Sequence, residues 1–232
     1  MWKEIVAAWR GEDLLGRMFS EFDQMLDHAY WMFQRATDVV SRKLPWEEVR
    51  DELYARDRKV NSLERSVRRQ IVEHLTLRPQ ADVPACLVLM SVVKDAERIG
   101  DYCKNLFEVG MLFPSDFTTT AGYIEPFNEI RERVNKLFVD ARKAFRETDI
   151  EAGRDVMRTY GGIGGDCESI VRKLLSAEQD VRTTEGVAYT LLARHYKRVG
   201  AHLANIASTV VAPLDSIDFM DEKHVPPVKE DN

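Results

Sequence analysis

Carboxylate and amide side chains recur at helical spacing in two segments of the 232-residue chain. They are Asp57, Asn61 and Glu64 in the first segment, and Glu97, Asp101 and Asn105 in the second. Steps of three or four residues place the side chains of each segment on one helix face, beside apolar neighbours rather than opposite them. If the two helices pack antiparallel, four carboxylates and two amides can converge.

Four carboxylates near one another repel, and removing them from water is costly. A compensating cation is therefore expected, and the candidates are Arg98 and a bound metal ion. An all-oxygen set without a nearby His or Cys pair favours hard ions such as Mg²⁺, Ca²⁺, Mn²⁺ and iron, and Zn²⁺ also accepts carboxylates. The alternative is a solvated rim of ordinary helical ion pairs.

The second segment is repeated 100 residues later without its acids. Residues 97–105 read ERIGDYCKN and residues 197–205 read KRVGAHLAN, which keeps Arg, Gly and Asn in register. Residues 64–69 and 168–173 share Glu, Val and Arg at a similar offset. Glycine inside a helix costs about 1 kcal/mol relative to alanine, so its presence at both 100 and 200 favours close helix packing. The repeat predicts two tandem three-helix units.

Helix signals dominate, and strand signals with period two are absent. Proline, glycine and capping residues predict six long helices. Five lie at roughly residues 12–43, 45–77, 82–113, 123–146 and 183–211, and the other, fifth along the chain, begins at residue 148. Asp82 is the predicted N-cap of the third helix, and Thr148 begins a capping box with Glu151 for the fifth. Four glycines within residues 161–165 predict a kink or break in that fifth helix.

The predicted fold is therefore all-α, with two tandem three-helix bundles that arose by internal duplication. Residues 1–114 form the first bundle with an N-terminal extension, and residues 122–213 form the second, degenerate bundle. The charged tail at residues 214–232 is predicted to be flexible.

Composition limits the classes of function. The formal net charge of −6 argues against a nucleic-acid-binding protein. Three scattered cysteines without a CxxC pair fit a reducing compartment. Neither a secretory leader nor an 18-residue apolar run is apparent, so any membrane role is predicted to be peripheral. His195 and His202 are predicted to be surface or packing residues rather than ligands.

The pattern Asp57-x-x-Val60-Asn61-x-x-Glu64, followed by Glu97-Arg98-Ile99-Gly100-Asp101-x-x-x-Asn105, resembles the signature of PhoU-type phosphate-uptake regulators. The duplication, the six-helix plan and the chain length agree with this resemblance. It implies a cytoplasmic, non-enzymatic regulator of phosphate transport and phosphate homeostasis. The implied partners are a phosphate transporter subunit, a membrane sensor kinase or both, and the implied assembly is a homodimer.

The resemblance also implies iron or zinc bound at the acidic motif. The implied ligands are Asp57, Asn61, Glu64, Glu97, Asp101 and Asn105. Their counterparts in the second half are Tyr160, Gly164, Glu168, Lys197, Ala201 and Asn205, of which only Glu168 and Asn205 keep the ligand type. No metal is expected in the second half, where Lys197 is predicted to neutralise Glu168 instead.

Two other functions stay open at this level. A carboxylate-bridged metal-binding protein or metalloenzyme is motivated by the acids and would need an enclosed pocket with open coordination positions. A metal-free helical adaptor would need neither.

Overall fold

The computed structural model describes residues 14–78, 80, 82–113, 123–176 and 181–212. The helices in these ranges are α2 (Leu14–Val40), α3 (Trp46–Leu77), α4 (Val83–Leu112), α5 (Ile124–Glu147), α6 (Ile150–Leu175) and α7 (Thr183–Val211). No strand occurs within these ranges, and the all-α prediction is confirmed. The predicted N-terminal extension, the loop between the halves and the tail lie outside the described residues.

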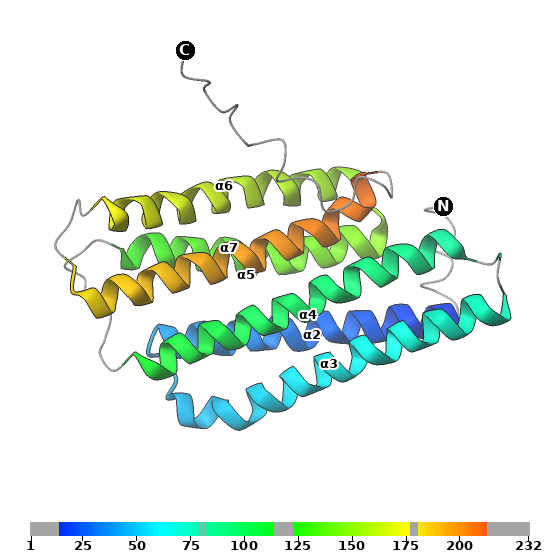
Figure 1. The fold of residues 1–232 in the computed structure, drawn as a ribbon. Coiled ribbons are helices and arrows are strands. Elements are labelled where there is room, and N and C mark those ends of the chain that lie inside the picture. Colours follow the sequence, from blue (N-terminus) through cyan, green and yellow to red (C-terminus); the bar gives the residue numbers. More distant parts are fainter. Residues whose placement is uncertain (1–13, 79, 81, 114–122, 177–180, 213–232) are drawn as a thin grey trace, which may run out of the picture.

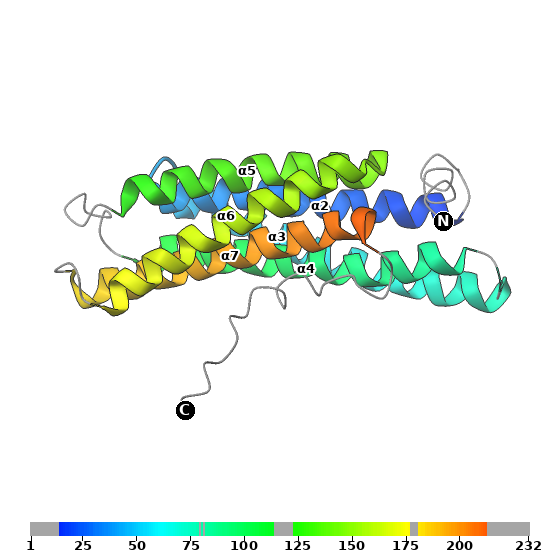
Figure 2. The same ribbon diagram turned by 90° about the horizontal axis from the view of Figure 1, so that it is seen from above.

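The helices form two three-helix bundles that lie side by side (Figure 1). Helices α2, α3 and α4 contact one another in the first bundle, and α5, α6 and α7 do so in the second. The bundles meet mainly through α4 and α7, which run in opposite directions through the middle of the molecule, and α2 makes a smaller contact with α5 (Figure 2). None of these described helices is long and apolar enough to cross a membrane.

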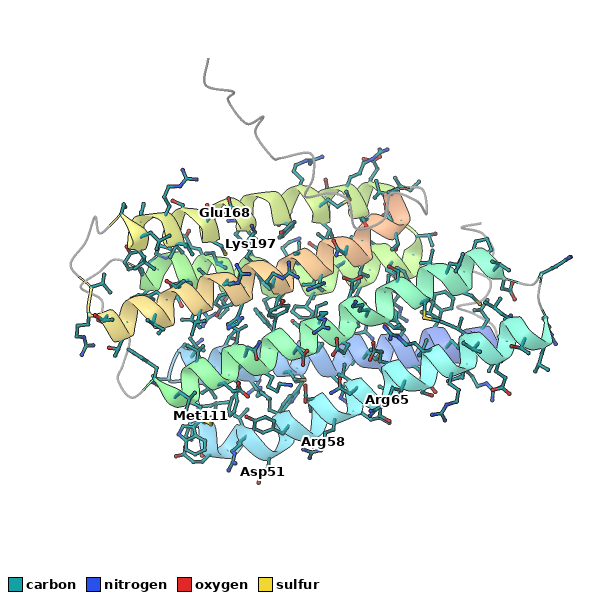
Figure 3. All side chains as sticks on the ribbon, in the orientation of Figure 1. Asp51, Arg58, Arg65, Met111, Glu168 and Lys197 are labelled. Atoms are coloured by element: carbon teal, nitrogen blue, oxygen red, sulfur yellow. The ribbon has the colours of Figure 1, made fainter. Side chains whose placement is uncertain are left out.

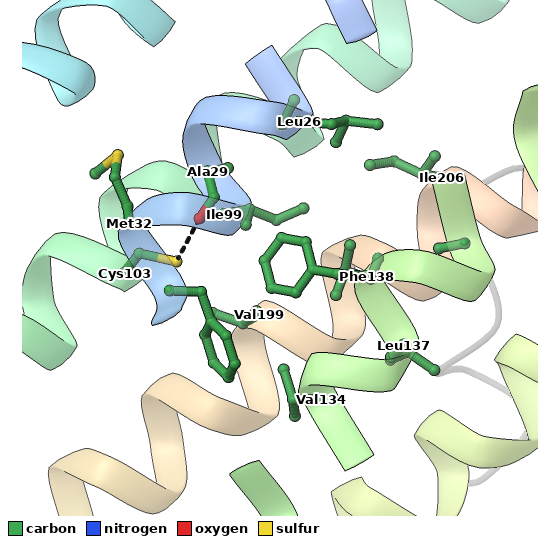
Figure 4. Close-up of a cluster of buried hydrophobic side chains, with 14 of the residues drawn as sticks. Leu26, Ala29, Met32, Ile99, Cys103, Val134, Leu137, Phe138, Val199 and Ile206 are labelled. Carbon is green, nitrogen blue, oxygen red and sulfur yellow. Dashed lines mark hydrogen bonds between the residues drawn. The ribbon is translucent and has the colours of Figure 1, made fainter. Parts of the chain in front are cut away.

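The cores of the two bundles join where α4 meets α7. Ile99 and Cys103 of α4 pack near Val199 of α7 and Phe138 of α5, and all four are buried (Figure 4). The Cys103 thiol lies 3.7 Å from the Ala29 carbonyl oxygen of α2 and donates to it. Burying a large apolar side chain stabilises a fold by about 1.5–3 kcal/mol, so this shared cluster holds the bundles together.

Two predicted caps differ from the structure. The capping box at Thr148 is wrong, because Thr148 ends α5 in the left-handed region at φ 51°. Asp149 is the N-cap of α6, and its carboxylate accepts a hydrogen bond from the Ala152 amide at 3.0 Å. Asp82 stands at the predicted N-cap of α4 but makes no capping bond there. Its carboxylate lies 3.1 Å from Nε2 of His74 instead.

Of the kink or break predicted at residues 161–165, the break is wrong, since α6 is continuous from Ile150 to Leu175. Its buried face is formed by Val156, Ile163, Cys167 and Ile170. Burial of this face offsets the cost of about 1 kcal/mol that each glycine adds. Two of the glycines, Gly161 and Gly165, face open space, and a Cβ there would meet nothing within 4 Å in the described part of the chain.

Alanine at the two open glycines should therefore stabilise the protein. Gly161→Ala and Gly165→Ala are each expected to raise the free energy of unfolding by about 0.5–1 kcal/mol, because alanine lowers the entropy cost of the helix without a clash. Gly153→Ala is the matched control in the same helix and should destabilise, since its Cβ would lie 2.7 Å from Cγ2 of Val211. Urea denaturation measures all three. A loss of stability in Gly161→Ala would contradict the reading of this face as open.

Candidate functional site

Lys104 bridges two of the predicted acids in the groove between α3 and α4. Its Nζ lies 3.1 Å from Oδ1 of Asp57 on α3 and 3.1 Å from Oδ1 of Asp101 on α4. Burial lowers the pKa of Lys104, but its hydrogen bonds to Asp101 and Asp57 outweigh this effect, and the net shift of the pKa is upward. Lys104 therefore stays protonated between the two carboxylates.

Arg98 continues the chain of charges toward Glu97. Its Nη1 lies 3.2 Å from Oδ2 of Asp101, and its Nε lies 3.5 Å from Oε2 of Glu97. Burial raises the pKa of the Glu97 carboxyl, and the nearby carboxylates of Asp101 and Glu64 raise it further against the opposing effect of Arg98. Arg98 is thus confirmed as a counter-ion. Lys104 was not predicted, although its i,i+3 spacing from Asp101 was an available signal.

The other predicted residues of α3 surround a surface pocket of about 390 Å³. It is lined by Arg58, Asn61, Glu64, Arg65 and Glu97. Arg68 lies 2.9 Å from Oε1 of Glu64 and pairs with it. Arg58 and Arg65 lie along the exposed side of α3 (Figure 3), so cations as well as acids face this pocket.

Asn105 does not join the other predicted residues. It lines a largely apolar groove of about 460 Å³ where the end of α4 meets the start of α7, together with Leu112, Val187 and His195. Four residues along a helix exceed a full turn by about 40°, so eight residues rotate Asn105 by about 80° relative to Glu97. This rotation carries its side chain toward the second bundle.

Asn105 therefore lies apart from the other predicted first-half ligands, while Lys104 links Asp57 to Asp101 and Arg98 links Asp101 to Glu97. Across the described residues, no three His, Cys, Asp or Glu side chains are grouped closely enough to hold a metal ion. The arrangement does not fit iron or zinc as it stands, because an ammonium group lies between the two carboxylates that face each other across the helices. Metal binding in the first bundle stays a prediction.

In the second bundle, Nζ of Lys197 lies 2.6 Å from Oε1 of Glu168 (Figure 3). This contact holds the pKa of Glu168 below its usual range and confirms the predicted pairing. Tyr160 packs over two glycines: a Cβ at Gly200 would lie 3.1 Å from its ring, and one at Gly164 would lie 3.9 Å away. Two of the counterparts, Tyr160 and Gly164, are thus used for packing between α6 and α7.

The close helix packing predicted from the repeated glycine is confirmed at Gly200 in the second bundle and not at Gly100 in the first. A Cβ at Gly100 would lie 3.6 Å from Cγ1 of Val60 on α3, which is an ordinary van der Waals contact.

A buried polar cluster that was not predicted joins the two bundles. Asp95 of α4 lies 2.7 Å from Nδ1 of His202 and accepts a hydrogen bond from Nδ2 of Asn205 at 3.1 Å. Asn205 therefore serves the contact between bundles, and Ala201 is buried in the same helix. The Tyr102 ring of α4 stacks on the His202 ring, with centroids 5.7 Å apart. We call this set, together with His195 and Arg198, the central cluster.

Tyr102 also contacts the two other members of the central cluster. Its ring centroid lies 5.9 Å from that of His195, and Nε of Arg198 donates to its hydroxyl at 3.1 Å. Burial lowers the pKa of His195 to about 4, with a further contribution from Arg194. Nδ1 of His195 and Nε2 of His202 are buried and have no hydrogen-bond partner among the described residues. Both histidines thus pack between the bundles.

A family model described as the PhoU domain matches residues 22–109 and 127–210, one match in each bundle. The chain belongs to the PhoU family. The family resemblance seen in the acidic motifs and the duplication are both confirmed.

Similar proteins carry the same family name. The chain is 23% identical over 223 residues to the phosphate-specific transport system accessory protein PhoU homolog of Xylella fastidiosa strain Temecula1. The alignment covers 93% of this chain and 88% of that protein. The homolog of strain 9a5c is also 23% identical, with 89% of its length covered.

Two solved structures show the same fold. PhoU from Pseudomonas aeruginosa aligns with a TM-score of 0.76 at 21% identity, over 85% of this chain and 95% of that one. The phosphate transport system regulatory protein PhoU from Streptococcus pneumoniae aligns with a TM-score of 0.70 at 14% identity and equal coverage.

His195 should make the stability of this PhoU-family protein depend on pH. Its pKa is about 4 in the folded state and near 6.5 in the unfolded chain, so the unfolded state binds more protons between these values. The free energy of unfolding therefore falls as pH falls through this window, by a His195 contribution on the order of 1–3 kcal/mol.

His195→Gln should flatten this dependence. Urea denaturation of both proteins at several pH values between about 4.5 and 7 measures it, and the comparison cancels the carboxylates that also titrate there. Parallel curves for the two proteins would show that His195 is not the group responsible.

Proposed function

We propose that the protein is a cytoplasmic regulator of phosphate transport and phosphate homeostasis that acts by binding other proteins and not by catalysis. The observation that carries this proposal is the PhoU-domain match over both bundles. The Xylella relatives, named as accessory proteins of a phosphate-specific transport system, support it. The proposed partners are a phosphate transporter subunit, a membrane sensor kinase or both.

The charge arrangement supports binding over metal-dependent catalysis. A carboxylate-bridged metalloenzyme needs open coordination positions beside its acids. Here Asp57 and Asp101 share Lys104, and Glu168 pairs with Lys197. The six long helices of the described residues instead present extended faces that a partner protein can cover.

The proposal includes the homodimer that the family resemblance implies. Sedimentation velocity at micromolar concentration should give twice the mass of the 26.7 kDa chain. A single species at the monomer mass would remove the dimer from the proposal and leave the regulatory function in place.

Affinity capture from membrane extracts of the native cells tests the proposed partners. A subunit of a phosphate transporter or a sensor kinase is expected to co-purify with the tagged protein, in different amounts at high and low phosphate. The same tag on an unrelated helical protein is the control. Recovery of no transport or kinase component in either condition would contradict the proposal.

Phosphate uptake in cells that lack the protein gives an independent readout. Loss of the protein is expected to raise uptake when phosphate is plentiful, and re-expression should reverse this. Uptake that does not change in either strain would count against a regulatory role.

A further inference from the structure

The position of Lys104 is that of a bridging cation. Its ammonium group touches one carboxylate oxygen from α3 and one from α4, at 3.1 Å each. These lengths lie at the long end of the range of N–H···O hydrogen bonds. Iron or zinc would need shorter bonds, near 2.0–2.2 Å for zinc to carboxylate oxygens, and at least four ligands. The space between Asp57 and Asp101 is therefore arranged for a lysine.

Each carboxylate of the acidic motif has a cationic partner without a metal ion. Four carboxylates of the motif are contacted directly by three cationic side chains, namely Arg68, Arg98 and Lys104. Arg58 and Arg65 also line the pocket that holds Glu64 and Glu97. An added divalent or trivalent ion would lie beside the Lys104 ammonium, and the two cations would repel.

In the second bundle a lysine also neutralises an acid, but at a different position of the repeat. There Lys197 of α7 pairs with Glu168 of α6, just as Lys104 of α4 pairs with Asp57 of α3. In both bundles a lysine on the third helix neutralises an acid on the second. The two lysines are not repeat equivalents, since the internal repeat aligns Lys197 with Glu97 and Lys104 with Ala204.

We propose that lysine ammonium groups replace the metal in both bundles, so that this chain is a metal-independent member of the PhoU family. Lys104 holds the acidic motif of the first bundle together, and Lys197 neutralises the single remaining acid, Glu168, in the second. This inference goes beyond the proposed function and does not depend on it, because a regulator that binds partners needs the folded bundles and not the ion.

Metal analysis of the full chain purified without chelator is the first test. We expect far less than one equivalent of iron or zinc, and a thermal midpoint that EDTA leaves unchanged. One equivalent of either metal, lost in an Asp57→Asn/Asp101→Asn variant, would overturn the inference. That result would not affect the affinity-capture experiment. Metal independence and the proposed regulatory function can therefore be contradicted independently of each other.

Substitution of Lys104 gives the second test. Lys104→Met keeps an unbranched side chain, one heavy atom shorter, and removes its charge, so Asp57 and Asp101 repel each other and the thermal midpoint should fall. Added Mn²⁺ should raise the midpoint of this variant and leave the wild type unchanged, because only the variant lacks the ammonium group between the carboxylates of Asp57 and Asp101. Lys104→Arg is the control that keeps the charge and should behave as the wild type does.

The matched control in the other bundle is Lys197→Met. It leaves the single carboxylate Glu168 without its cation, and Mn²⁺ is not expected to restore its midpoint. Equal responses of the wild type and Lys104→Met to Mn²⁺ would overturn the role assigned to Lys104. If Lys104→Met does not fold, the metal content of the wild type and its response to EDTA still decide whether the chain is independent of metal.

Discussion

The packing of α4 against α7 is the contact on which the rest of the structure depends. In α7 every residue from Val199 to Ala204 is buried, so neighbours cover all sides of the helix there. A three-helix bundle covers only the inward side of its third helix, and the other bundle must cover the rest. The apolar cluster around Ile99, Cys103 and Phe138 accordingly belongs to both bundles. The two repeats therefore share one core.

Shared burial dictates where the polar groups of these helices find partners. A buried polar group that loses water without gaining a hydrogen bond costs about 1–3 kcal/mol by mutational measures. Asp95 faces the other bundle and finds His202 and Asn205 there. Asp101 lies at the groove within its own bundle and finds Lys104. The central cluster and the lysine-bridged acids thus follow from the same physical rule on two sides of α4.

Divergence between the repeats has made the two bundles chemically different. The first keeps a row of acids and a pocket lined by Arg58 and Arg65. The second has replaced an acid by Lys197 and fills the space beside its glycines with the Tyr160 ring. The two bundles are therefore similar scaffolds with different surfaces.

The sequence by itself determined the helices, the duplication and the family, because helical periodicity, proline positions and motif spacing are local properties. It also identified the Lys197–Glu168 pair from the loss of an acid in the repeat. Only the tertiary structure decided that α6 continues through its glycines, since burial against α7 outweighs weak helix propensity. Likewise, the separation of Asn105 from the acids, the bridging role of Lys104 and the Asp95–His202 contact depend on distances between helices. Those distances are set by packing, which no local pattern encodes.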